Sequence, residues 1–413
     1  MKVRVKHLLI ILILCAGNVN AQTELDNYLK IAAENNPGIR SLFLDYNAAL
    51  EKIPQVGTLP NLNVSFGYFI QPIETRVGPQ RAKLGISQMF PWYGTLDAQE
   101  DVLVEAAKAK YERFEDAKSK LFFDVKSVYY NYYFIKKGIE ITQENLEILN
   151  TFKQLAIIKV ETGKVSVVDE LRVELEINEL DNNLIFLEDS KWTLEIEFNR
   201  LLNDSINYNI ITPDVLWEDD LELQKQVLLD SITNQNHLIK ELEHRMLSWQ
   251  NQEKVGHKVG LPSFVVGLDY AFIGKSDNTS LGKLNGRDAI MPMVGISIPL
   301  YRKKYKGIIN EALLKIESIE NKKIDKQNQL TILFERSYRD YSDANRRIDL
   351  YKKQFDIAEQ SLNILIVSYS ADGKNFEEVL RMERKVLKYA LELDKARADK
   401  NVAAAFINYL TGK

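Results

Sequence analysis

Two long stretches without proline constrain the fold of this chain more than any other feature. They run from Trp92 to Thr212 and from Leu300 to Lys413, and all ten prolines lie outside them. A proline inside a helix costs about 3 kcal/mol, so these stretches are free to form long helices. Apolar side chains along both stretches step alternately by four and three residues, as in helices that wrap around each other. In the first stretch these positions include Leu121, Val125, Val128, Tyr132, Ile135 and Ile139, and in the second Tyr341, Ala344, Ile348, Tyr351 and Phe355.

Each stretch is interrupted once by a short polar segment that contains glycine. The first interruption is Thr162-Gly163-Lys164, and the second is Asp372-Gly373-Lys374. Glycine just after a helix is a common stop signal, because it adopts the left-handed backbone conformation without strain. We therefore predict tight turns at Gly163, Lys164 and Gly373, each joining two antiparallel helices.

Four other segments alternate between bulky apolar and small or polar residues, as strands do. They cover approximately residues 61–70, 81–90, 263–273 and 289–300. Strands of a transmembrane β-barrel are about ten residues long and show this alternation. A soluble sheet with one buried face gives the same pattern in any single strand, but four such strands with bulky apolar faces favour the barrel. The opposite face would then line the lumen with Arg81, Lys83, Asp269, Met291 and Met293.

Four strands are too few to close a barrel, since the smallest bacterial barrels have about eight. An open sheet edge leaves backbone groups without hydrogen bonds, which a lipid environment does not tolerate. If the strands span a membrane, several chains must share one barrel.

The first 21 residues have the three parts of an export signal. Lys2, Arg4 and Lys6 form a positive region, Leu8–Leu14 is apolar, and cleavage is expected after Ala21. A lipoprotein signal with a lipid on Cys15 is the alternative, although the leucine before Cys15 argues against it. Cleavage after Ala21 removes the one cysteine, which suits an oxidising compartment.

Short motifs recur at a nearly constant offset and indicate an internal duplication. Leu59-Pro60 recurs as Leu261-Pro262, and Leu171-Arg172 recurs as Leu380-Arg381. We predict a signal peptide over 1–21, a first structural repeat over 22–215 and a second over 216–413.

Catalytic and ligand-binding motifs are weak or missing in the sequence. No HExxH, P-loop or GxSxG motif is present, and Glu241-x-x-His244 is only half of a di-iron motif. Met291 and Met293 are soft enough to bind a copper-type ion, but we favour their interpretation as adaptable side chains that line a barrel. A net charge of −4 argues against nucleic-acid binding. We expect no metal, no cofactor and no enzymatic activity, and we interpret the acidic run Glu218-Asp219-Asp220 as solvated or at the membrane border.

Taken together, the element order and several motifs resemble the outer membrane efflux protein family, the TolC-like channels. The motifs are Asn35-Asn36-Pro37, Leu59-Pro60-Asn61, Gln88 to Gly94, Ile298 to Tyr301 and the two Gly-Lys turns. The resemblance implies an α+β membrane protein located in the outer membrane, with a periplasmic extension. It also implies a homotrimer whose barrel has 12 strands, four from each chain, continued by a helical coiled-coil tunnel.

Such channels export solutes passively, and a periplasmic membrane-fusion adaptor and an inner-membrane pump of RND or ABC type deliver the cargo. The exported substrate is left open between drugs, metal ions and polypeptides. The alternative function is a periplasmic or secreted coiled-coil scaffold without channel activity.

The resemblance also implies a gate at the periplasmic tip, beside the two helical turns. Relatives close this end with a polar network, and the matching positions are Asp169, Tyr369 and Lys374. Lysine replaces the family's arginine at 374, which loses a bidentate contact. Glu378 matches an acidic position that forms a cation-selective ring, whereas Arg381 departs from a second acidic position. Exposed polar surface beside a turn is the alternative interpretation of all five residues.

Overall fold

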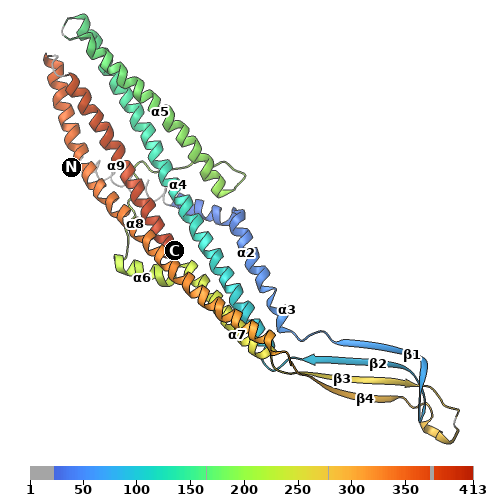
Figure 1. Cartoon of the computed structure of the whole chain (residues 1–413). Helices are drawn as coiled ribbons and strands as arrows, with labels where there is room; N and C mark the ends of the chain where they lie inside the picture. The colour runs from blue at the N-terminus through green and yellow to red at the C-terminus, as the bar shows by residue number, and fades with distance from the viewer. Residues whose placement is uncertain (1–22, 164, 278, 373–375, 413) are drawn as a thin grey trace, which may run out of the picture. The chain divides into compact units, whose positions relative to one another are not determined.

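The computed structural model describes residues 23–163, 165–277, 279–372 and 376–412. The chain forms two compact units, each assembled from separate segments (Figure 1). The helical unit takes in the chain up to Ser41, Phe114–His237 and the residues from Gln327 onward. The sheet unit takes in Leu42–Arg113 and Leu238–Lys326. Both units draw on both halves of the chain, so they follow a different division from the two repeats 22–215 and 216–413, which stay a prediction.

The two proline-free stretches form the four longest described helices, as predicted. They are α4 (Thr95–Glu161), α5 (Val167–Leu202), α8 (Arg302–Asp372) and α9 (Phe376–Leu410). The shorter helices are residues 23–35, α2 (Pro37–Leu50), α3 (Ile53–Gly57), α6 (Lys225–Gln235), α7 (His237–Val259) and the 3₁₀ segment η1 (Thr279–Leu284).

The turn between α4 and α5 forms as its sequence predicts. Gly163 has φ 70°, and its N–H donates to the carbonyl of Val160. Ser166 then caps α5 by accepting a hydrogen bond from the N–H of Val168 at 3.2 Å. Lys164, Gly373 and Lys374 lie outside the described residues.

Four tyrosines of α4 form the centre of the largest apolar cluster of the helical unit, which we call the tyrosine core. Tyr129, Tyr130, Tyr132 and Tyr133 are all buried, and residues around them include Leu25, Phe198, Leu202 and Ile210. Each hydroxyl donates one hydrogen bond, to Ile211 O, Asp219, Glu195 and Asp394 respectively, at 2.9–3.1 Å. Because buried hydroxyls need partners, these bonds fix α5, the segment after it and α9 against α4.

In the acidic run Glu218-Asp219-Asp220, Glu218 and Asp220 are exposed to solvent but also form ion pairs. The Lys400 ammonium contacts Glu218 at 3.0 Å and Asp220 at 2.8 Å, and Asp219 accepts from Tyr130. The run therefore joins the segment after α5 to α9. The sequence could not show this because Lys400 lies far along the chain.

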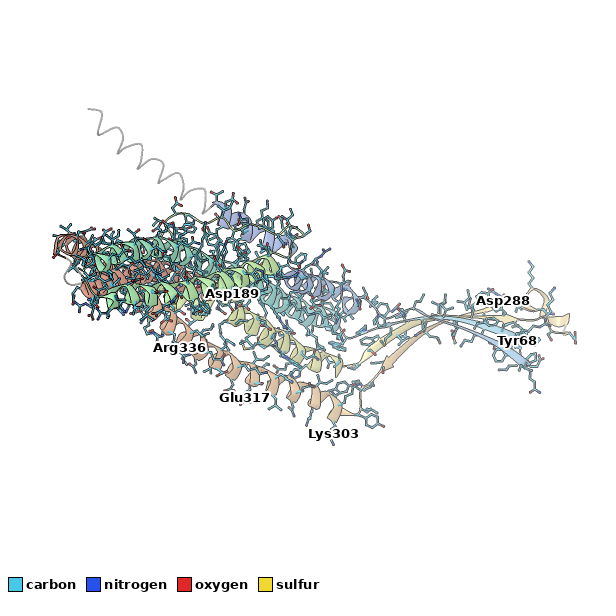
Figure 2. All side chains as sticks on the ribbon, turned by 90° about the horizontal axis from the view of Figure 1, so that it is seen from above. Tyr68, Asp189, Asp288, Lys303, Glu317 and Arg336 are labelled. Atoms are coloured by element: carbon cyan, nitrogen blue, oxygen red, sulfur yellow. The ribbon has the colours of Figure 1, made fainter. Side chains whose placement is uncertain are left out.

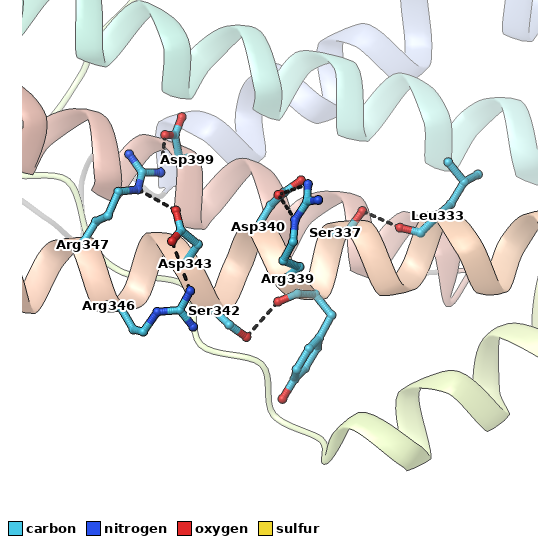
Figure 3. A network of polar contacts seen from close by, with 10 residues as sticks. Leu333, Ser337, Arg339, Asp340, Ser342, Asp343, Arg346, Arg347 and Asp399 are labelled. Atoms are coloured by element: carbon cyan, nitrogen blue, oxygen red, sulfur yellow. Dashed lines mark hydrogen bonds and ion pairs between the residues drawn. The ribbon is translucent and has the colours of Figure 1, made fainter.

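A second set of charged bonds joins α8 to α9. Arg347 on α8 donates to Asp343 at 3.0 Å and to Asp399 on α9 at 2.7 Å (Figure 3). The two carboxylates raise the pKa of Arg347 against the opposing effect of burial. The Arg347 guanidinium thus links a carboxylate on its own helix, α8, to a carboxylate on α9.

The sheet unit contains four antiparallel strands in the order β1-β2-β3-β4. They are β1 (Asn63–Thr75), β2 (Gly78–Phe90), β3 (Ser263–Ile273) and β4 (Ala289–Ser297). β1 continues past residue 70 through Pro72. A proline is tolerated there because β1 is an end strand of the sheet, and the β1–β2 register shifts between Tyr68 and Ile73. β4, the other end strand, contains Pro292 and ends at Ser297.

The strand register aligns the apolar rows of all four strands on one face. One row pairs Val64 with Ile86 and Ile86 with Leu268, and the next pairs Phe66 with Leu84, Tyr270 and Ile290. Side chains project from both faces of the sheet (Figure 2), and Tyr68 is 69% exposed. The sheet therefore presents a wide apolar face that none of the described residues covers.

Candidate functional site

The chain next to the helical turns forms a small apolar cluster, which we call the tip core. It takes residues from all four long helices: Leu149, Phe152, Val173, Leu362, Tyr369, Phe376, Val379 and Leu380. Three of the predicted gate residues, Asp169, Glu378 and Arg381, lie in the same part of the helical unit.

Tyr369 is the centre of the tip core and is only 2% exposed. Its ring centroid lies 4.7 Å from that of Phe376. Its hydroxyl finds no hydrogen-bond partner among the described residues. Burial, with a smaller effect of the Asp169 carboxylate, raises the pKa of Tyr369 to about 12. Asp169 and Tyr369 thus interact electrostatically in this structure without a hydrogen bond, and Lys374 lies outside the described residues.

Lys159 is a functional candidate that we did not predict. It is 8% exposed, its ammonium lies 4.1 Å from the centroid of the Tyr369 ring, and it donates to the Tyr369 carbonyl. A desolvated cation over an aromatic face contributes about 2 kcal/mol or more. The signal was present in the sequence, because Leu149, Phe152, Ala156 and Lys159 continue the three-and-four spacing of buried positions.

The exposed charges at the tip are paired across and along helices. Arg172 contacts Asp169 at 3.5 Å on its own helix and Glu377 of α9 at 3.2 Å. Burial raises the pKa of Asp169, and the Arg172 guanidinium opposes that shift. Arg381 forms an ion pair with Glu378, so the two predicted selectivity positions neutralise each other within this chain.

Glu383 is a second candidate that sequence reasoning missed. It is 2% exposed on α9 and forms no hydrogen bond or ion pair with the described residues, while the neighbouring Arg384 pairs with Glu176 of α5 at 3.1 Å. Burial first, and the Glu176 carboxylate second, raise the pKa of Glu383 to about 7, against a lowering effect of Arg384. A carboxyl with this environment changes its charge near neutral pH.

On the less apolar face of the sheet, Lys83 of β2 forms an ion pair with the buried Asp269 of β3. Gly85 lies directly opposite Asp269, and a Cβ there would come within 2.6 Å of the Asp269 carboxylate. The absence of a side chain at Gly85 therefore makes room for the Asp269 carboxylate. Met291 is the β4 partner of Asp269, and Met293 follows one row away opposite Gly267.

Arg81 does not follow the simple alternation of β2. The β2–β3 register shifts between Gln80 and Ala82, which makes Arg81 the extra residue of a bulge. A Cβ on Gly274 would lie 2.5 Å from Arg81 Nε, so the side chain lies against that glycine. The alternation pattern alone therefore does not assign Arg81 to a face.

The half di-iron motif has other partners in the sheet unit. His244 Nδ1 lies 2.7 Å from Glu105, and Glu241 pairs with Arg245 at 3.5 Å. Among the described residues, no group of three or more His, Cys, Asp or Glu side chains is placed to hold a metal ion. Within the same residues, no helix has the length and apolar character required to cross a membrane.

Comparison with known proteins agrees with this geometry. Residues 28–203 match the model of the outer membrane efflux protein family. No curated protein sequence matches the chain. The structure is similar to a membrane protein of Pseudomonas aeruginosa, with TM-score 0.75, 14% identity, and coverage of 94% of this chain and 92% of that one.

Two further solved structures have nearly the same similarity. CusC has TM-score 0.75 and 15% identity, with coverage of 94% of this chain and 92% of that one. The outer membrane protein VceC of Vibrio cholerae has TM-score 0.74 and 14% identity, with coverage of 95% and 97%. The resemblance to the outer membrane efflux protein family is therefore confirmed, and the fold is that of the TolC-like channels. These findings also support a location in the outer membrane with an extension into the periplasm, and a channel rather than an enzyme.

Proposed function

We propose that this protein is the outer-membrane channel subunit of a tripartite efflux or type I secretion system. The observation that carries the proposal is the four-stranded sheet with two unpaired end strands, β1 and β4, and an uncovered apolar face. In a bilayer the unpaired backbone groups of both end strands need partners, and identical chains supply them when β4 of one pairs with β1 of the next.

Three copies give a barrel of about 12 strands, wide enough to continue into a tunnel. The apolar rows with Val64 and Leu268 then face lipid, and the row with Lys83, Asp269, Met291 and Met293 faces the lumen. Arg81, at the bulge of β2, is also proposed to face the lumen.

Transport through such a barrel is passive, and the energy comes from an inner-membrane pump that reaches the channel through a periplasmic adaptor. The tip core, with Asp169, Tyr369, Lys374, Glu378 and Arg381 around the turns at Gly163, Lys164 and Gly373, is the proposed gate. The arrangement of apolar packing and paired charges supports a closed resting state, because both must be disrupted for the helix pairs to separate.

Native mass spectrometry of the detergent-purified protein tests the assembly, and a trimer is expected. Leu268→Arg places a cation on the proposed lipid face at a cost of about 2–4 kcal/mol near mid-bilayer and should abolish membrane insertion. Ser297→Arg, on β4 and on the opposite face of the sheet from Leu268, is the matched control and should assemble. A monomer, or equal insertion of both variants, would contradict the proposal. Release from membranes by a salt wash would favour the coiled-coil scaffold instead.

A further inference from the structure

The last three turns of α5 and the segment that follows them form a groove that the channel function does not use. Its helix side carries Trp192, Ile196, Asn199, Arg200 and Asn203, a spacing that keeps all five on one face over about 16 Å of helix. The opposite side is Asp204, Asn207, Tyr208 and Asn209, and the groove has a volume of about 500 Å³. That volume is within the range of about 300–1,000 Å³ typical of ligand sites.

Hydrogen bonds hold the groove in shape. Asn199 accepts from the N–H of Tyr208 at 2.7 Å and donates back to the Tyr208 carbonyl at 3.3 Å. The Tyr208 hydroxyl donates to Asp204 at 2.6 Å. Asn203 ends α5 in the left-handed conformation, with φ 47°, which turns the chain back along the helix. The groove is therefore preformed, so binding does not have to order it.

Several side chains in the groove remain available to a ligand. Trp192 is 65% exposed. The side chains of Arg200, Asn207 and Asn209 have no hydrogen bond or ion pair with the described residues. Each carboxamide offers two donors and one acceptor, and the guanidinium offers a fork that fits a carboxylate.

This combination matches the chemistry of an N-acetylated amino sugar that carries a peptide with a free carboxylate. The face of an indole ring is electron-rich and attracts the polarised C–H groups of a sugar ring. Acetamido and hydroxyl groups are matched by carboxamides and by the carboxylates of Glu195 and Asp204, which also line the groove. Arg200 is the one cation of the lining, which is too little positive charge for a nucleic acid.

We propose that this groove binds the glycan strands of peptidoglycan, with Trp192 stacked on an amino sugar and Arg200 paired with a carboxylate of the stem peptide. A chain located in the outer membrane with a helical periplasmic part is exposed to this polymer. Binding would anchor the helical unit to the cell wall without a role in the transport step.

Co-sedimentation of the full-length protein with purified peptidoglycan sacculi tests the proposal. Trp192→Ala should weaken binding at least tenfold. Phe186→Ala is the matched control, because Phe186 lies on the same helix, is also 65% exposed and does not line the groove. It should bind as wild type does.

A second measurement separates the two parts of the ligand. Arg200→Ala should weaken binding of a soluble disaccharide-tetrapeptide several-fold and leave binding of uncharged tetra-N-acetylchitotetraose unchanged. Equal binding by the Trp192 and Phe186 variants would overturn the proposal. A Trp192→Ala variant that binds sacculi normally but no longer forms the wild-type oligomer would also overturn it and assign the groove to a contact between subunits. Oligomer size and conductance are measured on the same variants, so a failure here is distinguishable from a failure of the channel proposal.

Discussion

The tyrosine core and the tip core both involve the long helices, but they differ in whether their buried tyrosine hydroxyls are hydrogen-bonded. In the tyrosine core every one of the four α4 hydroxyls donates a hydrogen bond. In the tip core the Tyr369 hydroxyl has no partner among the described residues, while Lys159 is buried over its ring. The nearby Glu383 is buried, and its carboxyl forms no ion pair within the described part of the chain.

This difference indicates different tasks for the two regions. A fully bonded polar network favours one arrangement, because any movement leaves buried groups unsatisfied. A core with unsatisfied groups loses less when its helices separate, since those groups regain water. The tyrosine core is thus suited to hold the helices together, and the tip core is suited to open.

The largest expected difference comes from two aspartates, each paired with an arginine three residues further along its helix. Asp394→Ala leaves Arg397 unpaired and the Tyr133 hydroxyl without its acceptor in a mostly buried place, and should lower the free energy of unfolding by about 3–4 kcal/mol. Asp169→Ala leaves Arg172 with Glu377 and should cost less than about 1 kcal/mol. Thermal unfolding followed by circular dichroism compares them, and equal losses would remove the distinction between the cores.

The second prediction concerns Glu383 and pH. Its pKa is about 7 in the folded protein, against 4.5 for an ordinary glutamate, so the folded state holds the proton more tightly than the unfolded state. Stability should therefore fall as pH rises from about 4.5 to 7 and stay low above that. Glu383→Gln removes this loss and should stabilise the protein by about 3 kcal/mol at pH 8, with little change at pH 4.5. Melting temperatures across this range test it, with the exposed, Arg-paired Glu378→Gln as control.

Two tyrosine-to-phenylalanine substitutions compare the contribution of a single hydroxyl to stability in each core. Tyr133→Phe removes a hydroxyl that donates to Asp394 and accepts from the N–H of Leu216 at 3.1 Å, and should cost about 1–2 kcal/mol. Tyr369→Phe removes a hydroxyl without a partner and should be neutral or slightly stabilising. A loss at Tyr369 as large as that at Tyr133 would show that its hydroxyl is bonded in the assembled protein.

The smallest effect on stability should accompany the clearest effect on conductance. Asp169→Ala combined with Tyr369→Phe removes a charge and a hydroxyl beside the turns and is expected to loosen the tip. Single-channel conductance in a planar bilayer should rise well above that of the wild type. Unchanged conductance in correctly assembled oligomers would exclude these residues from the gate.

Much of the fold was predictable because it depends on local patterns. The missing prolines located α4, α5, α8 and α9, and two-residue alternation located the four strands. The predicted end of β1 at residue 70 was too early, because the alternation of one strand does not show how far its pairing with the next strand continues. The bulge at Arg81 was missed for a related reason, since register depends on the partner strand.

The candidate sites were less predictable because they depend on distant partners. Glu383 follows the repeated pair Leu380-Arg381 by two residues, and nothing local shows that it is buried. The same holds for Lys400, because its partner Glu218 lies 182 residues away in the chain. Lys159 is the exception, because a charged residue in a continuous apolar spacing is visible in the sequence itself.

The hydrogen-bonded tyrosines of α4 also give the protein a built-in optical reporter. Burial raises the pKa of Tyr129, Tyr130, Tyr132 and Tyr133 above the ordinary value of 10.0. In moderately alkaline buffer these phenols stay protonated while the helices are packed, and they ionise when the packing is lost. Tyrosinate absorbance would then follow the integrity of this region in detergent or in vesicles, without any label.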